Sequence, residues 1–235
     1  MAKQQVKSGD NTTRWIVIAM VLLVVVTGVV FSLMSQSNKE NASLAALDGT
    51  KLQPAIVSTI DAANGSAITL NSGQAKAVDI WEDPQCPVCK NFEDANGTYI
   101  ESLVREKKAT VRFHVLSFLG DESVRAANAS FCAADEGQYL DFHHALYAVQ
   151  SPLENSGFLS NDKLVSIGKK IGFNSTKFAN CVTKGSKIDL VKANYDSMSK
   201  FGVKGTPTVF IDGKLWERKS PDFNLAEFKA AVEAK

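Results

Sequence analysis

One apolar stretch constrains this 235-residue chain more than any other feature, because residues 15–34 carry no charge and are almost wholly apolar. A helix of about twenty residues, rising about 1.5 Å per residue, crosses a hydrocarbon core of roughly 30 Å. Lys3, Lys7 and Arg14 precede the stretch, whereas only Lys39 follows it closely. By the positive-inside rule we expect a transmembrane anchor at 15–34, with residues 1–14 in the cytoplasm and the remaining chain outside.

A cleaved signal peptide is the alternative, but its apolar region is usually about 7–15 residues long, and no convincing Ala-x-Ala site follows this one closely. Residues 35–54 begin with a polar segment rich in Ser, Asn and Ala, which predicts a flexible tether. The sequence therefore predicts a single-pass cell-membrane protein whose domain, residues 55–235, is extracytoplasmic.

The composition of the chain narrows the class of function. Its formal net charge of +1 argues against nucleic acid as a partner, which requires a clustered basic surface. The roughly 185 residues beyond the leader suffice for one domain with a real core. Four cysteines are too few to act as the scaffold, so each needs its own explanation.

Hydrophobic patterning predicts an α/β domain. Residues 55–70 read as a hairpin around Asn64-Gly65, a two-residue turn signal. The remaining predicted strands lie at 76–81, 110–119 and 208–211, and one more begins at 215. The predicted helices are one that begins in the Cys86–Cys89 motif and ends at about 107, a helical region at about 122–178 broken near 137, 151 and 172, one at about 186–201, and a last one capped by Asn224. The long helical segment, about 121–185, is predicted to be an insertion between strands.

The pair Cys86 and Cys89, separated by Pro87 and Val88, stands at the start of the first predicted helix. Disulfide exchange needs a nucleophilic thiolate and a second thiol that resolves the mixed disulfide. A helix N-terminus favours negative charge on the first sulfur, and Pro87 is tolerated there because it has no N–H to lose. We predict Cys86 as the exposed attacking thiol and Cys89 as the buried resolving thiol.

Two alternative roles for this motif stay open. Half of a zinc site would have the same spacing, but Cys132 and Cys181 are isolated and neither supplies a second matching pair. An inert structural disulfide is the second alternative. The segment Gly205-Thr206-Pro207-Thr208 favours redox chemistry. A proline has no N–H to donate to the neighbouring strand, so its place at the start of a strand needs a special reason. In a thioredoxin-type site that reason is a cis-proline opposite the cysteine pair. An ordinary edge-strand proline is the alternative there.

Three blocks of sequence resemble the DsbA-like thioredoxin-fold oxidoreductases, especially the membrane-tethered ones of Gram-positive bacteria. They are Trp81-Glu82-Asp83-Pro84-Gln85-Cys86-Pro87-Val88-Cys89-Lys90, then Phe131-Cys132-Ala133-Ala134 continuing through residues 138–147, and Phe201-Gly202-Val203-Lys204-Gly205-Thr206-Pro207-Thr208-Val209-Phe210-Ile211. The resemblance implies a thioredoxin fold with an inserted helical domain, Cys86 as nucleophile, Cys89 as resolving thiol, and Pro207 as a cis-proline preceded by Thr206.

The chain departs from this family at two places. Val88 stands where the best-known members have a histidine that helps to stabilise the thiolate. Ile80 stands where many relatives have a buried acid, and Asp79 or Glu82 are the nearby candidates to replace it. The first departure predicts an enzyme that is not among the most oxidising.

The other two cysteines, Cys132 and Cys181, are expected to form a structural disulfide. Of the three possible pairings of four cysteines, this one leaves the redox motif intact. The resemblance supports this pairing, because some family members have a disulfide within the helical insertion. An extracytoplasmic location makes a permanent disulfide natural. Two buried free thiols are the alternative.

The three histidines receive no catalytic role. His114 is expected on the solvent face of its strand, and of the neighbours His143 and His144 one is expected to pack and one to be solvated. No cofactor and no metal ligand are predicted.

The function predicted is an extracytoplasmic thiol–disulfide oxidoreductase, an oxidase that introduces disulfides into reduced exported proteins through Cys86 and Cys89. Re-oxidation by a membrane quinone-linked partner is implied by the resemblance. A disulfide reductase or isomerase, and a redox-inactive tethered binding protein or chaperone, are the alternatives.

Overall fold

The computed structural model describes residues 15–23, 25–28 and 44–234, and the chain divides into two units, residues 1–45 and 46–235. In the first unit, residues 15–23 and 25–28 are helical. No helix among the described residues is long and apolar enough to cross a membrane. The predicted anchor at 15–34 and the predicted tether at 35–54 both lie partly outside the described residues. The anchor stays a prediction, as does the part of the tether at 35–43.

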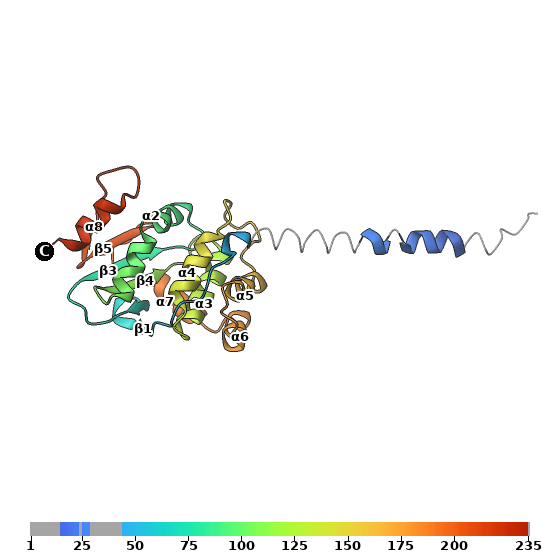
Figure 1. The fold of residues 1–235 in the computed structure, drawn as a ribbon, viewed down its shortest axis with the longest axis horizontal. Coiled ribbons are helices and arrows are strands. Elements are labelled where there is room, and N and C mark those ends of the chain that lie inside the picture. Colours follow the sequence, from blue (N-terminus) through green and yellow to red (C-terminus); the bar gives the residue numbers. More distant parts are fainter. Residues whose placement is uncertain (1–14, 24, 29–43, 235) are drawn as a thin grey trace, which may run out of the picture. The chain divides into compact units, whose positions relative to one another are not determined.

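Within residues 46–234, a six-stranded mixed sheet has the order β1-β2-β4-β3-β5-β6 (Figure 1). Strands β3 and β4 are parallel and joined by helix α2 (Pro87–Arg105), and the other neighbours are antiparallel. The β3–α2–β4 unit, followed by β5, β6 and helix α8, is the predicted thioredoxin fold. The bounds are β1 Ser58–Asp61, β2 Ala67–Leu70, β3 Ala77–Glu82, β4 Thr110–Val115, β5 Thr208–Ile211, β6 Lys214–Leu215 and α8 Leu225–Glu233.

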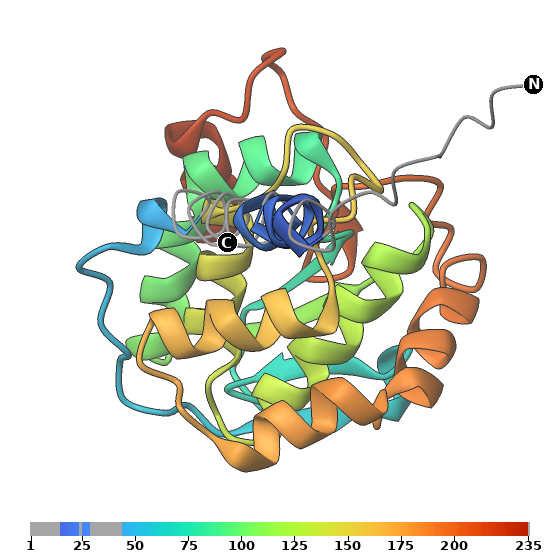
Figure 2. The same ribbon diagram turned by 90° about the vertical axis from the view of Figure 1, so that its right-hand side faces the viewer.

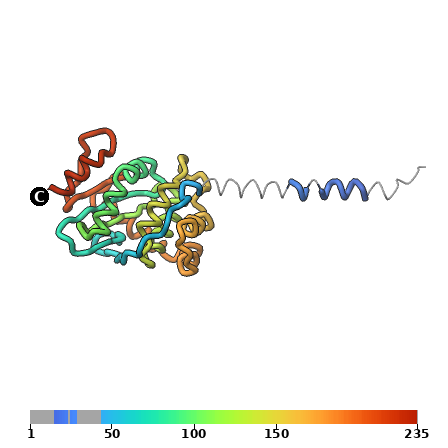
Figure 3. Tube along the Cα trace, viewed as in Figure 1, coloured from blue at the N-terminus to red at the C-terminus, as the bar shows by residue number. Residues whose placement is uncertain are grey.

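The helical insertion lies between β4 and β5, as predicted. It comprises α3 (Asp121–Ala134), α4 (Tyr139–Ala148), α5 (Asn161–Lys170), α6 (Thr176–Lys184) and α7 (Ile188–Ser197), so it extends beyond the predicted end at about residue 185. Helix α3 packs against both α6 and α7 (Figure 2). In the Cα trace of residues 46–234, α5 and α6 lie at one end of the folded unit and α8 lies at the other (Figure 3). The disulfide Cys132–Cys181 joins α3 to α6.

The alternation of side chains in the strands explains the core. Val78 and Ile80 of β3 share one face with Val111 and Phe113 of β4, and all four are buried. Apolar side chains of α2 and α8 belong to the same core and extend it beyond the sheet. They are Phe92, Ile100, Leu103, Val104, Phe228 and Val232.

The opposite face of the sheet is also covered, and this makes the expectation for His114 wrong. His114 is 1% exposed, and its ring stacks on Trp81 with centroids 3.6 Å apart. Phe201, which follows α7, packs against both rings. The alternating strand pattern therefore marks one fully buried apolar face and one polar face that is covered at Trp81 and His114 and partly exposed at Asp79 and Arg112.

Two local expectations also differ from the structure. The hairpin between β1 and β2 contains a short 3₁₀ helix, Ala62–Asn64, capped by Asp61, so its turn is longer than the two-residue turn expected at Asn64-Gly65. The folded unit begins at residue 46 rather than 55. Leu47 is buried, and the Gln53 backbone N–H donates to Asp141.

The disulfide supplies the prediction from this part of the structure. Replacing Cys132 and Cys181 together by Ser removes a covalent link between residues 49 positions apart in sequence. In the chain-entropy model, this link stabilises the folded state by roughly 4 kcal/mol, because it restricts the unfolded chain. We expect the free energy of unfolding to fall by a few kcal/mol, measured by denaturant titration, while thiol exchange at Cys86 persists. A variant as stable as the wild type would contradict this role.

Candidate active site

Cys86 is the N-cap residue of α2, and Pro87 occupies the first helical turn. The motif follows β3 almost directly, and the Cys86 backbone N–H donates to the Asp83 carbonyl at 2.9 Å, which closes a tight turn. Unpaired amides of the first helical turn therefore point towards the Cys86 sulfur. Both Cys86 and Cys89 are free thiols, with Cys89 one helical turn below.

Thr206 and Pro207 lie opposite this turn. The Thr206–Pro207 peptide bond is cis, and the Cys86 thiol lies 3.7 Å from the Thr206 carbonyl oxygen, to which it donates. The Thr206 hydroxyl is buried and has no hydrogen-bond partner among the described residues, so it is available to donate to a Cys86 thiolate. The structure thus brings together all six residues that the sequence assigned to the site, from Cys86 to Cys89 and at 206–207.

The two sulfurs differ sharply in acidity. The pKa of Cys86 is lowered to about 6, chiefly by a hydrogen bond from the Cys89 thiol; burial opposes this, while the Thr206 hydroxyl and the amides of Cys89 and Val88 add to it. The pKa of Cys89 is raised well above the ordinary value, first by burial and then by its hydrogen bond and charge interaction with Cys86. At neutral pH, Cys86 is the thiolate and Cys89 the proton donor.

The exposure of Cys86 differs from the expectation. The residue is only 7% exposed, because it belongs to a buried cluster with Cys89 and Tyr147 of α4, against which Leu119 packs. Val88, by contrast, is 44% exposed. The attacking sulfur therefore lies recessed between the helix turn and Thr206, and the apolar Val88 stands on the surface beside it.

Asp83 is a buried acid immediately before the motif. Its carboxylate accepts hydrogen bonds from the Ser123 hydroxyl at 2.6 Å and from the backbone N–H groups of Gln85 and Leu119 at 2.9 and 3.2 Å. Burial raises its pKa to about 6, these three donors oppose the rise, and the charge of Cys86 adds to it. The carboxylate fixes the turn that presents Cys86.

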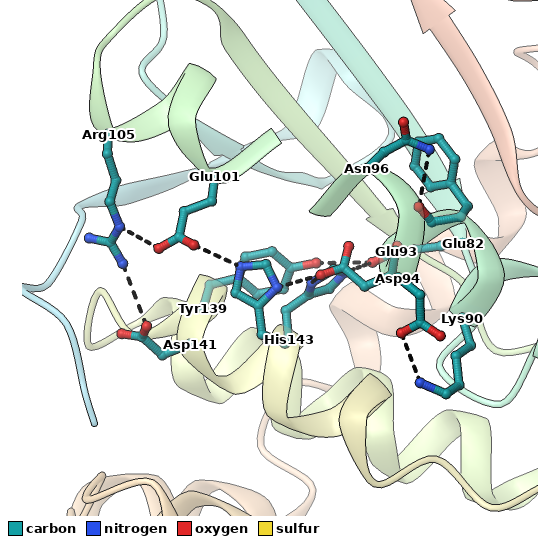
Figure 4. A network of polar contacts seen from close by, with 12 residues as sticks. Glu82, Lys90, Glu93, Asp94, Asn96, Glu101, Arg105, Tyr139, Asp141 and His143 are labelled. Atoms are coloured by element: carbon teal, nitrogen blue, oxygen red, sulfur yellow. Dashed lines mark hydrogen bonds and ion pairs between the residues drawn. The ribbon is translucent and has the colours of Figure 1, made fainter. Parts of the chain in front are cut away.

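A second polar network lies between α2 and α4 (Figure 4). Glu82, the last residue of β3, is 3% exposed; its Oε1 accepts from the Tyr139 hydroxyl at 3.2 Å and lies 2.8 Å from His143 Nε2. Of the two acids considered in place of Ile80, Glu82 is therefore the buried one near the motif, because Asp79 pairs with Arg112 on the other face of the sheet. Sequence reasoning missed the network, whose members come from three separate elements.

His143 is 3% exposed and His144 is partly exposed, which agrees with the expectation that one packs and one reaches solvent. Burial lowers the pKa of His144, but hydrogen bonds to Glu101 and Glu93 outweigh it and raise that pKa to about 10. His144 is therefore positively charged at neutral pH and compensates part of the negative charge of Glu93 and Glu101.

A family model described as thioredoxin matches residues 65–234, which is more than half of the chain. This chain belongs to the thioredoxin family. Oxidised DsbA from Mycobacterium tuberculosis is similar, with a TM-score of 0.60 and 26% identity over 71% of this chain and 91% of that chain. MdbA from Actinomyces oris, a thiol-disulfide oxidoreductase, gives a TM-score of 0.61 and 25% identity over 72% and 88%. BdbD from Bacillus subtilis, 22% identical with a TM-score of 0.62 over 76% and 97%, shows the same fold.

The curated relatives include the serine/threonine-protein kinase PknE of Mycobacterium tuberculosis, which is 29% identical over 153 residues. That match covers 59% of this chain and 27% of the kinase, so the chain spans about a quarter of that relative's length. The resemblance to the DsbA-like oxidoreductases is confirmed, and the chain combines this fold with a pair of free cysteines at the start of α2.

The Thr206 hydroxyl supplies a test of the acidity of Cys86. In the wild type, ultraviolet absorbance of the thiolate should titrate with a midpoint of about 6. Thr206→Val keeps the shape but removes a donor to a charged group, worth about 1.5–3 kcal/mol, so the thiolate fraction below the midpoint should fall about tenfold or more. Val88→His, which adds a donor, should move the midpoint the other way. A wild-type midpoint at or above about 8.5 would contradict the assignment.

The same shift predicts how the stability of the reduced protein depends on pH. The folded pKa of Cys86, about 6, is below the unfolded value of about 8.5, so the contribution is fully present above pH 8.5 and is lost as pH falls through 6. The pKa of Asp83 affects stability in a lower pH window, from about 4 to 6, and its main causes, burial and three hydrogen bonds, are common to both proteins compared. The free energy of unfolding of reduced wild type minus that of Cys86→Ser should therefore rise by about 2–3 kcal/mol between pH 6 and 8.5, less than the full shift because solvent screens part of the interaction. A flat difference would refute it.

Proposed function

We propose that this protein is an oxidase that introduces disulfides into reduced proteins outside the cytoplasm. A substrate thiolate attacks the Cys86 sulfur of the oxidised pair, the Cys86–Cys89 bond breaks, and Cys89 leaves with a proton. A second substrate thiolate then attacks the substrate sulfur of the mixed disulfide and displaces the Cys86 thiolate. The substrate loses two electrons and gains a disulfide, and the cysteine pair is reduced.

The asymmetry between the two thiols is the observation that carries this proposal. A thiol of low pKa leaves a mixed disulfide faster, so the lowered pKa of Cys86 favours release of an oxidised substrate. In the competing reaction, Cys89 attacks the Cys86 sulfur of the mixed disulfide and releases the substrate in its reduced form. The raised pKa of Cys89 keeps its thiol protonated and therefore disfavours this attack. A stable Cys86 thiolate also stabilises the reduced pair and makes the disulfide more oxidising.

The reductase or isomerase alternative is favoured by one specific feature, the absence of a polar donor at Val88. The Cys86 pKa of about 6 lies between that of the attacking cysteine in thioredoxin, about 7, and that in DsbA, about 3.5. We therefore place the reduction potential between about −270 and −120 mV, the values of those two proteins.

An extracytoplasmic, membrane-tethered location belongs to the same proposal. It is supported by the uncharged stretch at 15–34 with basic residues before it, and by the Cys132–Cys181 disulfide, since permanent disulfides persist in oxidising compartments. A catalytic cycle then needs an electron acceptor, for which we propose a quinone-linked membrane protein.

Redox trapping in intact cells tests direction and location together. A membrane-impermeant thiol reagent should leave Cys86 unlabelled in resting cells, because the pair is oxidised, and should label it after mild reduction from outside. The double variant Cys86→Ser with Cys89→Ser should abolish disulfide formation in exported proteins. Its Cys132–Cys181 disulfide should stay intact, which serves as the control that the variant is folded. A reduced resting state with a potential near about −270 mV would favour the reductase, and full function of the double variant would favour a redox-inactive binding protein.

A further inference from the structure

We propose that Glu93, His143 and His144 form a binding site for a divalent transition-metal ion, Zn²⁺ by its ligand chemistry, between helices α2 and α4. This site is separate from the cysteine pair and does not depend on the direction of the redox reaction. One candidate ligand atom from each of the three residues lies within 4.8 Å of the others. Two imidazoles and one carboxylate are a ligand set that zinc uses in proteins.

The donor atoms converge in a manner suited to one ion. His143 Nδ1 lies 3.6 Å from Glu93 Oε1, and His144 Nδ1 is in close contact with the same oxygen. A tetrahedral ion with bonds of about 2.0–2.2 Å holds its ligand atoms about 3.4 Å apart, so small side-chain movements would suffice. The site would have three protein ligands and one open position.

A buried, unpartnered nitrogen is the independent observation that points to a ligand. His143 is 97% buried, since it is 3% exposed, and no described residue forms a hydrogen bond with its Nδ1, although the atom is directed at Glu93. A buried polar atom without a partner costs about 1–3 kcal/mol, which a bound metal ion would offset.

The outer nitrogen of His143 is hydrogen-bonded to a further carboxylate, and that of His144 lies near one. His143 Nε2 lies 2.8 Å from Glu82 Oε1, and His144 Nε2 lies 3.6 Å from Glu101 Oε2. Metal-binding histidines almost always use the second ring nitrogen in this way, which fixes the tautomer and the ring orientation. Both rings therefore present Nδ1 to the same point, with carboxylates behind them.

The charge balance agrees with a cation at this point. Glu82, Glu93 and Glu101 face the cluster, with Asp141 at its edge and Arg105 paired with Glu101 and Asp141. Without a metal, the protonated imidazole of His144 compensates part of this negative charge at neutral pH, and a bound metal ion would take the place of that proton. Gly97, one turn after Glu93 on α2, makes room for the carboxylate, because a Cβ at that position would collide with it.

Metal titration of the oxidised full-length protein in detergent tests the site, because the disulfide keeps Cys86 and Cys89 from binding metal. We expect one Co²⁺ or Zn²⁺ per chain, a cobalt spectrum without a sulfur-to-metal charge-transfer band, and a thermal midpoint that rises with Zn²⁺ and reverts with chelator. His144→Gln and Glu93→Gln should weaken binding at least about 100-fold, and Glu101→Gln about 10-fold to 100-fold. Asp94→Asn, an exposed acid next to Glu93 outside the cluster, should leave binding unchanged.

Gly97→Ala keeps every ligand and should still weaken binding, because it displaces the Glu93 carboxylate. The proposal is overturned if the oxidised protein binds no metal, if binding survives both ligand variants, or if binding appears only after the cysteine pair is reduced. None of these results bears on the reduction potential, so this proposal and the oxidase proposal fail separately.

Discussion

The pairing of β3 with β5 is the constraint on which the active site depends. Trp81 lies opposite Thr208 in this antiparallel register, so the end of β3 and the start of β5 meet at one edge of the sheet. The chain leaves β3 directly into the turn before Cys86 and enters β5 directly from Thr206 and Pro207. A one-residue slip would turn Glu82 to the other face of the sheet and separate Thr206 from the sulfur. The chemistry of the thiols is thus a consequence of strand register as much as of the motif.

Signals contained in a short segment predicted their structures well. The bounds of β5, the N-cap at Asn224 and the helix start at Pro87 each follow from a few adjacent residues, and the structure has them at those positions. The two-residue turn expected at Asn64 was wrong because the Asp61 side chain caps a 3₁₀ turn there. The dipeptide Asn64-Gly65 alone gives no information about a capping residue three positions earlier.

Features that depend on distant partners could not be predicted from one sequence. His114 is buried because Trp81 and Phe201, from two other segments, cover a face that a single strand pattern assigns to solvent. Glu82 meets His143 across 61 residues of sequence, and Cys86 is recessed because Tyr147 packs against it. Hydrophobic periodicity reports which side of an element is apolar, but it does not report which polar groups meet across a core.

Helix α2 links the thiol pair to the polar network. Its first turn stabilises the Cys86 thiolate, and Glu93, one turn beyond Cys89, anchors the same helix to α4 through His143 and His144. Gly97 in the middle of α2 costs about 1 kcal/mol of helix propensity relative to Ala, and it leaves the space that the Glu93 carboxylate occupies. Because Tyr147 of α4 is also in one buried cluster with Cys86 and Cys89, a change in how α2 packs on α4 would move Cys86 relative to Thr206. The position of the reactive sulfur is therefore set from two directions, by the register of β3 on β5 and by the buried charges that join α2 to α4.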